Sequence, residues 1–441
     1  MIFTDRRTFV GGVSTLAVMP ASAIAGSRDI VSKPFPKNFL WATATAGHQV
    51  EGNNTNSDTW LLENVKPTVF SEPSLDACNS FEMWPTDLDL VKSLGLGAYR
   101  FSLEWARIEP IKGHFSIAML NHYKAMIEGC RARGILAMVT FNHFTTPKWF
   151  AGEGGWTNPE SSDLFARYCE KATRHLGADI GYATTLNEPN LTLAVAASVP
   201  ELVAPFAKYI EAMSDAAGKA MGSSQFRLTN LMPIDVARAS LPNMIAAHQK
   251  GREAIKSIRA ELPVGVSLAM GDEQGYAPRR DEVRRGAYGD WLQAVKGDDF
   301  LGVQNYSRNV WGADGKRVPP PPGAKKGSNG DEVYAPSLAG AVRFAHAASG
   351  CPILVTEHGV GTDDDTIRAE LIPAALRELR MAIDEGVPVI GYTHWTLLDN
   401  FEWIYGYKAK FGLCSVDRAT FKRTPKPSAF VFGAIAKRNA V

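Results

Sequence analysis

The chain has 441 residues, of which 45% are hydrophobic and 21% are charged, proportions typical of a globular protein. Basic and acidic residues nearly cancel and leave a formal charge of +1. This balance argues against nucleic acid or an anionic membrane surface as the main partner, since either requires an excess of Lys and Arg.

The N-terminal segment has the pattern of an export signal. Arg6 and Arg7 precede a short, mildly apolar run that ends near Ile24 in small residues. Such a pattern is typical of a signal peptide, and the paired arginines indicate the twin-arginine type, which directs export to the bacterial periplasm. The alternative is a terminal helix that carries two ordinary arginines. We predict a cleaved signal over 1–27 and a mature domain over 28–441.

Eight short apolar segments recur along the mature domain, with amphipathic helical segments between them. One helix is predicted where Leu120, Tyr123, Ile127 and Cys130 share a face. Eight nearly continuous apolar strands that alternate with helices predict an α/β fold, a parallel sheet closed as a single (β/α)8 TIM barrel. The predicted strands are Phe39–Ala46, Ala98–Leu103, Ile135–Phe141, Tyr182–Leu186, Val264–Met270, Phe300–Tyr306, Ile353–Thr356 and Val389–Trp395.

Side chains suited to binding and chemistry stand at the ends of these strands. In this fold the functional residues gather at the C-terminal ends of the strands, so these positions are expected to share one site. They are Gln49, Arg100, His143, Glu188, Asn305, Glu357 and Trp395.

Two of these residues form a pair of carboxyl groups. Cleavage of a glycosidic bond needs one carboxyl that is protonated and one that is ionised, on either side of the bond. Glu188 follows the fourth predicted strand and Glu357 follows the seventh. Taken singly, each could equally be a solvated loop residue or a helix cap, but two at matching strand ends indicate catalysis.

The longest irregular segment runs from Trp311 to Val333 and contains four consecutive prolines. It is expected to be a surface loop at the mouth of the barrel, serving either as a rim for substrate or as a solvated insertion. The five cysteines are scattered and have no metal-ligand spacing, so no metal or cofactor is expected. No segment after the signal reaches the ~20 apolar residues of a membrane span. Nothing in the sequence indicates an oligomeric state.

Several blocks of the chain resemble glycoside hydrolase family 1, the β-glucosidase family. Residues 39–52 (FLWATATAGHQVEG) resemble its N-terminal signature and residues 99–108 (YRFSLEWARI) its second-strand block. Residues 187–189 (NEP) and 356–359 (TEHG) resemble its acid/base and nucleophile motifs, and residues 395–403 (WTLLDNFEW) its last-strand loop. The blocks follow the order of the family along nearly the whole mature chain.

The resemblance implies a role for each matching residue. Glu188 would be the general acid/base and Glu357 the nucleophile of a retaining β-glycosidase. Arg100 would lie beneath Glu357 and lower its pKa, while Asn305 and Tyr306 would support the site. The residues that would bind the sugar are Gln49, His143, Asn187, Trp395, Glu402 and Trp403. The substrate would be a β-linked glycoside with a small-molecule or oligosaccharide aglycone.

Three positions depart from the family pattern. His358 stands where the family has Asn, Phe144 where it has Trp, and Ser307 where it has the second Tyr of a pair, a phenol that hydrogen-bonds the nucleophile. Loss of that phenol is expected to change the basicity of Glu357, and the departures favour an altered glycone or aglycone preference. Two alternatives stay open: a transglycosylase that uses the same residues, and a non-catalytic sugar-binding barrel.

Overall fold

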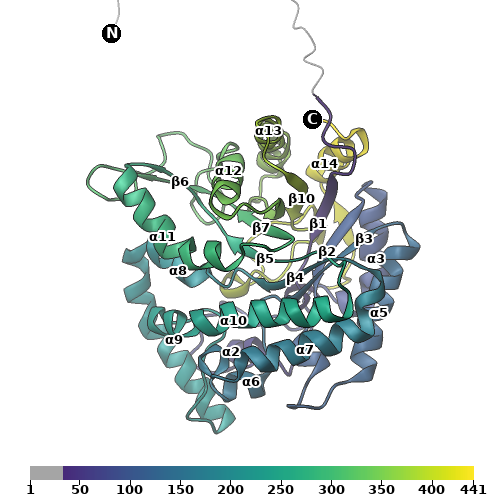
Figure 1. The fold of residues 1–441 in the computed structure, drawn as a ribbon, viewed down its shortest axis with the longest axis vertical. Helices are drawn as coiled ribbons and strands as arrows, with labels where there is room; N and C mark the ends of the chain where they lie inside the picture. The colour runs from purple at the N-terminus through teal and green to yellow at the C-terminus, as the bar shows by residue number, and fades with distance from the viewer. Residues whose placement is uncertain (1–32) are drawn as a thin grey trace, which may run out of the picture. The chain divides into compact units, whose positions relative to one another are not determined.

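The computed structural model describes residues 33–441, so the predicted signal over 1–27 lies outside the described residues and stays a prediction. Eight parallel strands close into a barrel in the order β1-β10-β9-β7-β5-β4-β3-β2 (Figure 1). The predicted TIM barrel is confirmed. Its strands are β1 (Leu40–Ala44), β2 (Ala98–Ser102), β3 (Leu136–Asn142), β4 (Ile180–Asn187), β5 (Val264–Ala269), β7 (Phe300–Asn305), β9 (Ile353–His358) and β10 (Val389–Trp395).

Every predicted strand is present, and its ends differ from the predicted ends by at most two residues. The eighth matches its predicted bounds, Val389–Trp395. The fourth begins earlier, at Ile180, and the seventh extends to His358, so that Glu357 lies within β9 instead of after it. Pairing extends this far because, after a one-residue register shift that follows Val303, Gln304 and Asn305 of β7 pair with Glu357 and His358.

Helices surround the barrel, and α7 and α10 pack side by side along one flank in Figure 1. The predicted helix through Leu120 and Cys130 is α5. None of the helices in the described part of the chain has the length and hydropathy of a membrane span. The helices are α1 (Gly47–Val50), α2 (Asp58–Asn64), α3 (Ser80–Ser93), α4 (Trp105–Ile108), α5 (Ile117–Ala132), α6 (Lys148–Gly152), α7 (Ser161–Leu176), α8 (Leu191–Ser198), α9 (Pro200–Met221), α10 (Ile234–Ile258), α11 (Ala277–Ala294), α12 (Ser337–Ser349), α13 (Asp365–Asp384) and α14 (Pro427–Arg438), with 3-10 turns at Gly155–Thr157, Gly177–Asp179 and Trp403–Tyr405.

An apolar layer fills the lower interior of the barrel. Ala42, Ala98, Met138, Phe300 and Leu354 come from five different strands and form one buried cluster. Since side chains two apart on a strand face the same side, Arg100 lies directly above Ala98 in β2. The apolar layer thus supports a polar layer at the C-terminal ends of the strands.

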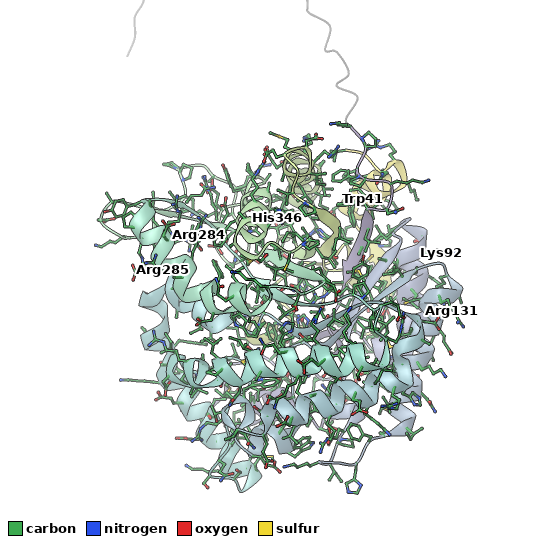
Figure 2. The ribbon with its side chains drawn as sticks, in the orientation of Figure 1. Trp41, Lys92, Arg131, Arg284, Arg285 and His346 are labelled. Atoms are coloured by element: carbon green, nitrogen blue, oxygen red, sulfur yellow. The ribbon has the colours of Figure 1, made fainter. Side chains whose placement is uncertain are left out.

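The barrel is tied shut where β1 meets the C-terminal segment. Leu40 to Ala44 pair in parallel with Gly391 to Trp395 of β10. The Trp41 indole, labelled in Figure 2, donates a hydrogen bond to Asn439 Oδ1 at 2.9 Å, just after α14. This contact joins the two ends of the folded domain.

The predicted loop after the sixth barrel strand carries order that the sequence did not predict. A small parallel sheet joins β6 (Asp272–Gly275) to β8 (Arg308–Trp311) beside the barrel mouth. The loop that follows is held by an Arg317–Asp331 ion pair at 2.7 Å and by a hydrogen bond from Ser328 N to Gly361 O at 2.8 Å. A second small sheet pairs β11 (Cys414–Val416) with β12 (Arg423–Pro425). All five cysteines are buried free thiols.

Candidate active site

The two predicted catalytic carboxyls come from β4 and β9 and reach the same polar layer. Glu357 lies in β9 and only 4% of it is exposed. Glu188 directly follows β4, and its backbone N donates to Ser267 O of β5 at 2.8 Å. Its φ of +45° lies in the left-handed region, which non-glycine residues adopt at a cost and which is common at functional sites.

Three donors surround the Glu357 carboxylate. Arg100 Nη1 donates to Oε1 at 2.6 Å, Gln304 Nε2 donates to the same oxygen at 2.9 Å, and Tyr306 donates to Oε2 at 2.7 Å. The predicted position of Arg100 beneath Glu357 is confirmed. Charge-assisted bonds of this kind hold an ionised carboxylate in a fixed orientation.

The net direction of the Glu357 pKa differs from the prediction. Burial raises the pKa above its ordinary value, and the charge of Arg100 together with hydrogen bonds from Tyr306, Arg100 and Gln304 opposes that rise. Arg100 lowers the pKa of Glu357 as predicted, but the cost of removing a carboxylate from water, which the prediction left out, outweighs that lowering.

Glu188 has a stronger preference for its protonated form. Burial raises its pKa well above the ordinary value, and the negative charge of Glu357 raises it further, while Arg100 opposes the rise. In contrast to Glu357, no hydrogen-bond donor to the Glu188 side chain is found within residues 33–441. The first proton to leave this pair therefore leaves Glu357, since only that carboxylate is met by donors.

The expectation that Glu357 lacks a tyrosine partner is wrong. Tyr306 follows β7 and donates to the carboxylate itself. Burial and then the charge of Glu357 raise the pKa of Tyr306 well above its usual value, so the phenol keeps the proton that it donates. The backbone carbonyl of Ser307 accepts from Asn305 Nδ2 at 3.1 Å.

Asn187 and His143 form an oriented pair beside the carboxyls. Asn187 Oδ1 accepts from Arg100 Nη2 at 2.5 Å and from Gln304 Nε2 at 2.7 Å, which fixes the orientation of its amide. Asn187 Nδ2 therefore donates to His143 Nε2 at 3.2 Å. Burial lowers the pKa of His143 well below its usual value, so the ring is neutral and Nδ1 carries the proton. This Nδ1 has no partner among residues 33–441 and is a donor for a ligand.

Gln49 and Glu402 form the second polar pair. Gln49 Nε2 donates to Glu402 Oε2 at 3.1 Å and to Phe401 O at 2.8 Å, while the buried Gln49 Oε1 has no partner in the described part of the chain. Burial, reinforced by the charge of Glu357, raises the pKa of Glu402 to about 8. Together they present one free acceptor and one carboxyl that is protonated at neutral pH, a combination suited to hydroxyl groups.

Aromatic rings complete the expected sugar site. The rings of His143 and Trp395 stack with centroids 5.5 Å apart, and His143 also stacks on Trp403 at 6.1 Å. Phe144, which replaces the family Trp, meets Trp403 edge-on at 5.2 Å and keeps an aromatic contact there. Of the predicted sugar-binding residues, all six are therefore brought to the same end of the barrel.

Asn305 and His358, which the sequence analysis singled out, contact other residues of the fold and do not contact the two catalytic carboxyls. Asn305 is fully buried, donates to Met270 O at 2.9 Å and accepts from Ser337. His358 contacts the Tyr392 hydroxyl at 2.8 Å, and burial lowers its pKa to about 3. As side chains alternate along a strand, His358 points away from the side on which Glu357 lies. Its departure from the family pattern thus falls outside the polar layer.

Gln304 was missed at the sequence level. It joins Glu357 to Asn187 and pairs in register with Glu357 across β7 and β9. Its spacing in the sequence could have identified it. Gln304 lies two residues before Tyr306, so both side chains face the barrel interior.

The comparisons with known proteins agree with this geometry. A sequence profile described as glycosyl hydrolase family 1 matches residues 31–287 and 320–441. The chain belongs to this family. It is therefore a glycoside hydrolase of the retaining β-glycosidase type, and the non-catalytic sugar-binding alternative is set aside.

Individual members of family 1 cover nearly the whole chain. A β-glucosidase of Agrobacterium sp. (strain ATCC 21400) is 30% identical over 91% of this chain and 95% of its own length. The crystal structure of β-glycosidase BGL167 is 42% identical, with a TM-score of 0.85 over 93% of this chain and 98% of that one. An apo β-glucosidase structure is 38% identical, with a TM-score of 0.87 over 91% and 99%.

Replacing Tyr306 with phenylalanine is expected to lower kcat/KM by about 10–100-fold, the worth of one hydrogen bond to a charged group. Because Tyr306 lowers the pKa of Glu357, its loss also moves the acid limb of the pH–rate profile to higher pH. Steady-state kinetics across pH measure both effects. Tyr168→Phe, which removes a buried phenol bonded to Phe141 O at 3.0 Å, is the control and should leave the profile in place. An unmoved acid limb in Tyr306→Phe would contradict this role.

Proposed function

We propose that Glu357 is the nucleophile and Glu188 the general acid/base of this family 1 enzyme. The observation that carries the assignment is the unequal setting of the two carboxyls. Glu357 is held by Arg100, Gln304 and Tyr306. Glu188 is half-buried, has no donor to its side chain among residues 33–441, and is exposed to the negative charge of Glu357. Such a division, with two neighbouring acids pushed toward opposite protonation states, supports one nucleophile and one acid.

Two displacements follow from these roles. Glu357 attacks the anomeric carbon while Glu188 gives its proton to the departing oxygen, which yields an alcohol and a glycosyl ester. Formation of the ester removes the negative charge of Glu357, one of the causes that raise the pKa of Glu188. Glu188, which became a carboxylate when it gave up its proton, then takes a proton from water. The water oxygen attacks the anomeric carbon, the ester bond to Glu357 breaks, and the sugar is released with its original configuration.

Glucose is the proposed glycone, which makes a β-glucoside the proposed substrate. The relatives named above include two β-glucosidases, and the polar layer offers both donors and acceptors to an uncharged sugar. His143 Nδ1 and Gln49 Oε1 are unpaired in the structure of residues 33–441, and Glu402 carries its proton at neutral pH. Trp395 supplies an apolar surface for the face of the ring.

A panel of p-nitrophenyl β-glycosides tests this function. The glucoside is expected to be cleaved with the largest kcat/KM, and proton NMR should show the β-anomer of the sugar as the first product. Methanol added to the reaction separates hydrolysis from transglycosylation by the ratio of free sugar to methyl glycoside. Release of the α-anomer would contradict the double displacement, and cleavage of another glycone alone would overturn the sugar assignment.

The pH–rate profile of kcat/KM is expected to be a bell displaced toward alkaline pH relative to two ordinary carboxyls. Activity rises with pH as Glu357 ionises and falls as Glu188 loses its proton. Because burial raises the pKa of both groups, and that of Glu188 by more, both limbs lie above the ordinary carboxyl range. An optimum below pH 4 would contradict these settings.

We also propose that the protein is exported to the periplasm. The support is the sequence pattern alone: the Arg6-Arg7 pair, the short apolar run and the small-residue exit before residue 28. Cell fractionation of the full chain and of a variant with both arginines changed to lysine tests it. Periplasmic activity that the double substitution does not reduce would contradict the twin-arginine route.

A further inference from the structure

A cavity of about 270 Å³ opens on one side of the catalytic carboxyls. Glu188, Gln304 and Tyr306 belong to its lining, so it is continuous with the polar layer that holds Glu357. Under the proposed function, Glu188 delivers its proton to the leaving oxygen. The group bonded to that oxygen, the aglycone, must therefore occupy the space on the Glu188 side.

One wall of the cavity is apolar. It consists of Leu191, Ala194, Val195, Val199, Ala269 and Met270, most of them on α8 or the turn that follows it. The sequence of α8, LTLAVAAS, carries no charge, and a helix that is apolar over most of its surface is normally covered. Yet 43% of Val195 is exposed. Its exposure at the cavity wall indicates a surface that substrate covers.

The polar side chains of the cavity are largely paired with one another. Asn309 Nδ2 donates to Glu273 Oε1 at 2.9 Å and approaches Ser198 Oγ at 3.3 Å. Arg317 and Asp331 form their own ion pair at 2.7 Å. A second sugar buried here would need partners for several hydroxyls, and each hydroxyl left without one is costly. Asn309, Arg317 and Asp331 are thus engaged. Within the described part of the chain, the polar groups of the lining left open are Gln304 Oε1, next to Glu357, and the Ser307 hydroxyl.

The aromatic rings of the cavity are also committed. The Tyr288 hydroxyl donates to Glu273 Oε1 at 3.2 Å and accepts from Gly271 N at 3.1 Å, and the Tyr306 hydroxyl is bonded to Glu357. Arg284 of α11, labelled in Figure 2, donates to the backbone carbonyl of Glu273 at 2.9 Å and holds the base of this cluster. The cluster is therefore a rigid wall without a free hydroxyl.

Part of the cavity lining lies outside the match to the family profile. Asn309 and Arg317 lie between residues 287 and 320, the segment that the profile does not match. Arg317 and Asp331 of the loop line the cavity, which favours a rim for substrate over a solvated insertion.

We propose that this cavity is an aglycone subsite that selects an apolar alcohol, aryl or alkyl, over a second sugar, and that Val195 is a specificity-determining residue in it. The proposal rests on the proposed roles of Glu188 and Glu357. Binding energy comes from covering the α8 wall and its neighbours. The paired polar groups add no compensation for the hydroxyls of a sugar.

Substrate series that share one glycone test the proposal. In the wild-type enzyme, octyl β-glucoside should exceed methyl β-glucoside in kcat/KM by at least about tenfold, since each buried methylene contributes about a fourfold gain. Octyl β-glucoside should also exceed cellobiose. If the p-nitrophenyl panel identifies another glycone, the alkyl glycosides and the disaccharide of that glycone are used. Equal values for octyl and methyl, or a preference for the disaccharide, would overturn the subsite.

Substitutions at Val195 locate the effect. Val195→Asn should lower kcat/KM for the octyl glycoside about fivefold and leave the methyl glycoside within twofold. Val195→Thr keeps the shape of the side chain and should change the octyl value in the same direction. The control is Ile117→Asn, also on a helix and 53% exposed but outside the cavity, and it should change neither value. Equal losses on both glycosides would overturn the role of Val195. Absence of activity on every aryl glycoside would instead refute the proposed function itself.

Discussion

Replacing Glu357 with glutamine is expected to lower kcat/KM on every β-glycoside by at least about 10⁴-fold, as loss of a covalent nucleophile does in other enzymes. Glutamine keeps the size of the side chain and can still contact Arg100 and Tyr306, so the loss reports the missing nucleophile. Initial rates with p-nitrophenyl β-glucoside measure it.

Glu109→Gln is the matched control for this substitution. Glu109 is fully buried and bonded to Trp105 Nε1 at 2.8 Å, to Gly113 N at 2.7 Å and to Arg167, and none of these partners is bonded to Glu188 or Glu357. The Glu109→Gln substitution should lower the melting temperature and leave kcat/KM nearly unchanged. A Glu357→Gln enzyme that retains more than a few per cent of wild-type activity would contradict the nucleophile assignment.

Replacing Glu188 with alanine is expected to have an effect that depends on the leaving group. Loss of general acid catalysis should reduce kcat/KM on alkyl glycosides by about 10²–10⁴-fold. A dinitrophenyl glycoside leaves without a proton, so its kcat/KM should fall by less than about tenfold. Comparison of the two substrates on the same variant measures the difference.

Azide provides an independent readout of Glu188→Ala. The second step lacks its base in this variant, and a small anion in the vacated space can replace activated water. We expect azide to raise kcat on the dinitrophenyl glycoside and to yield the β-glycosyl azide. Equal losses on alkyl and dinitrophenyl substrates, without rescue by azide, would contradict the acid/base role.

The barrel could be predicted from the sequence because its strands are short apolar runs whose pattern does not depend on distant contacts. Their ends depend on such contacts, since β9 extends to His358 through its pairing with β7 and β10. The β6–β8 sheet was not predicted. It joins two four-residue segments far apart in the sequence, and such short strands carry no periodic signal of their own.

The candidate site was predicted in its residue types but not in its connections. Arg100 and Glu357 were placed together correctly, yet the tyrosine partner was assigned to position 307 when Tyr306 supplies it. A motif gives the order of residues, whereas the phase of β7 decides which of them face the interior. The net direction of the Glu357 pKa could not be predicted for a similar reason, because it depends on burial, and burial is a property of the whole barrel.

Trapping with a 2-deoxy-2-fluoro-β-glycosyl fluoride tests the central claim most directly. The fluorine at carbon 2 slows both steps and the fluoride leaving group restores the first, so the glycosyl ester accumulates. Mass spectrometry of the intact protein should show one added fluoro-sugar, and peptide sequencing should place it on Glu357. A label on another residue, or turnover of aryl β-glycosides with no label under any glycone, would contradict the double displacement proposed here.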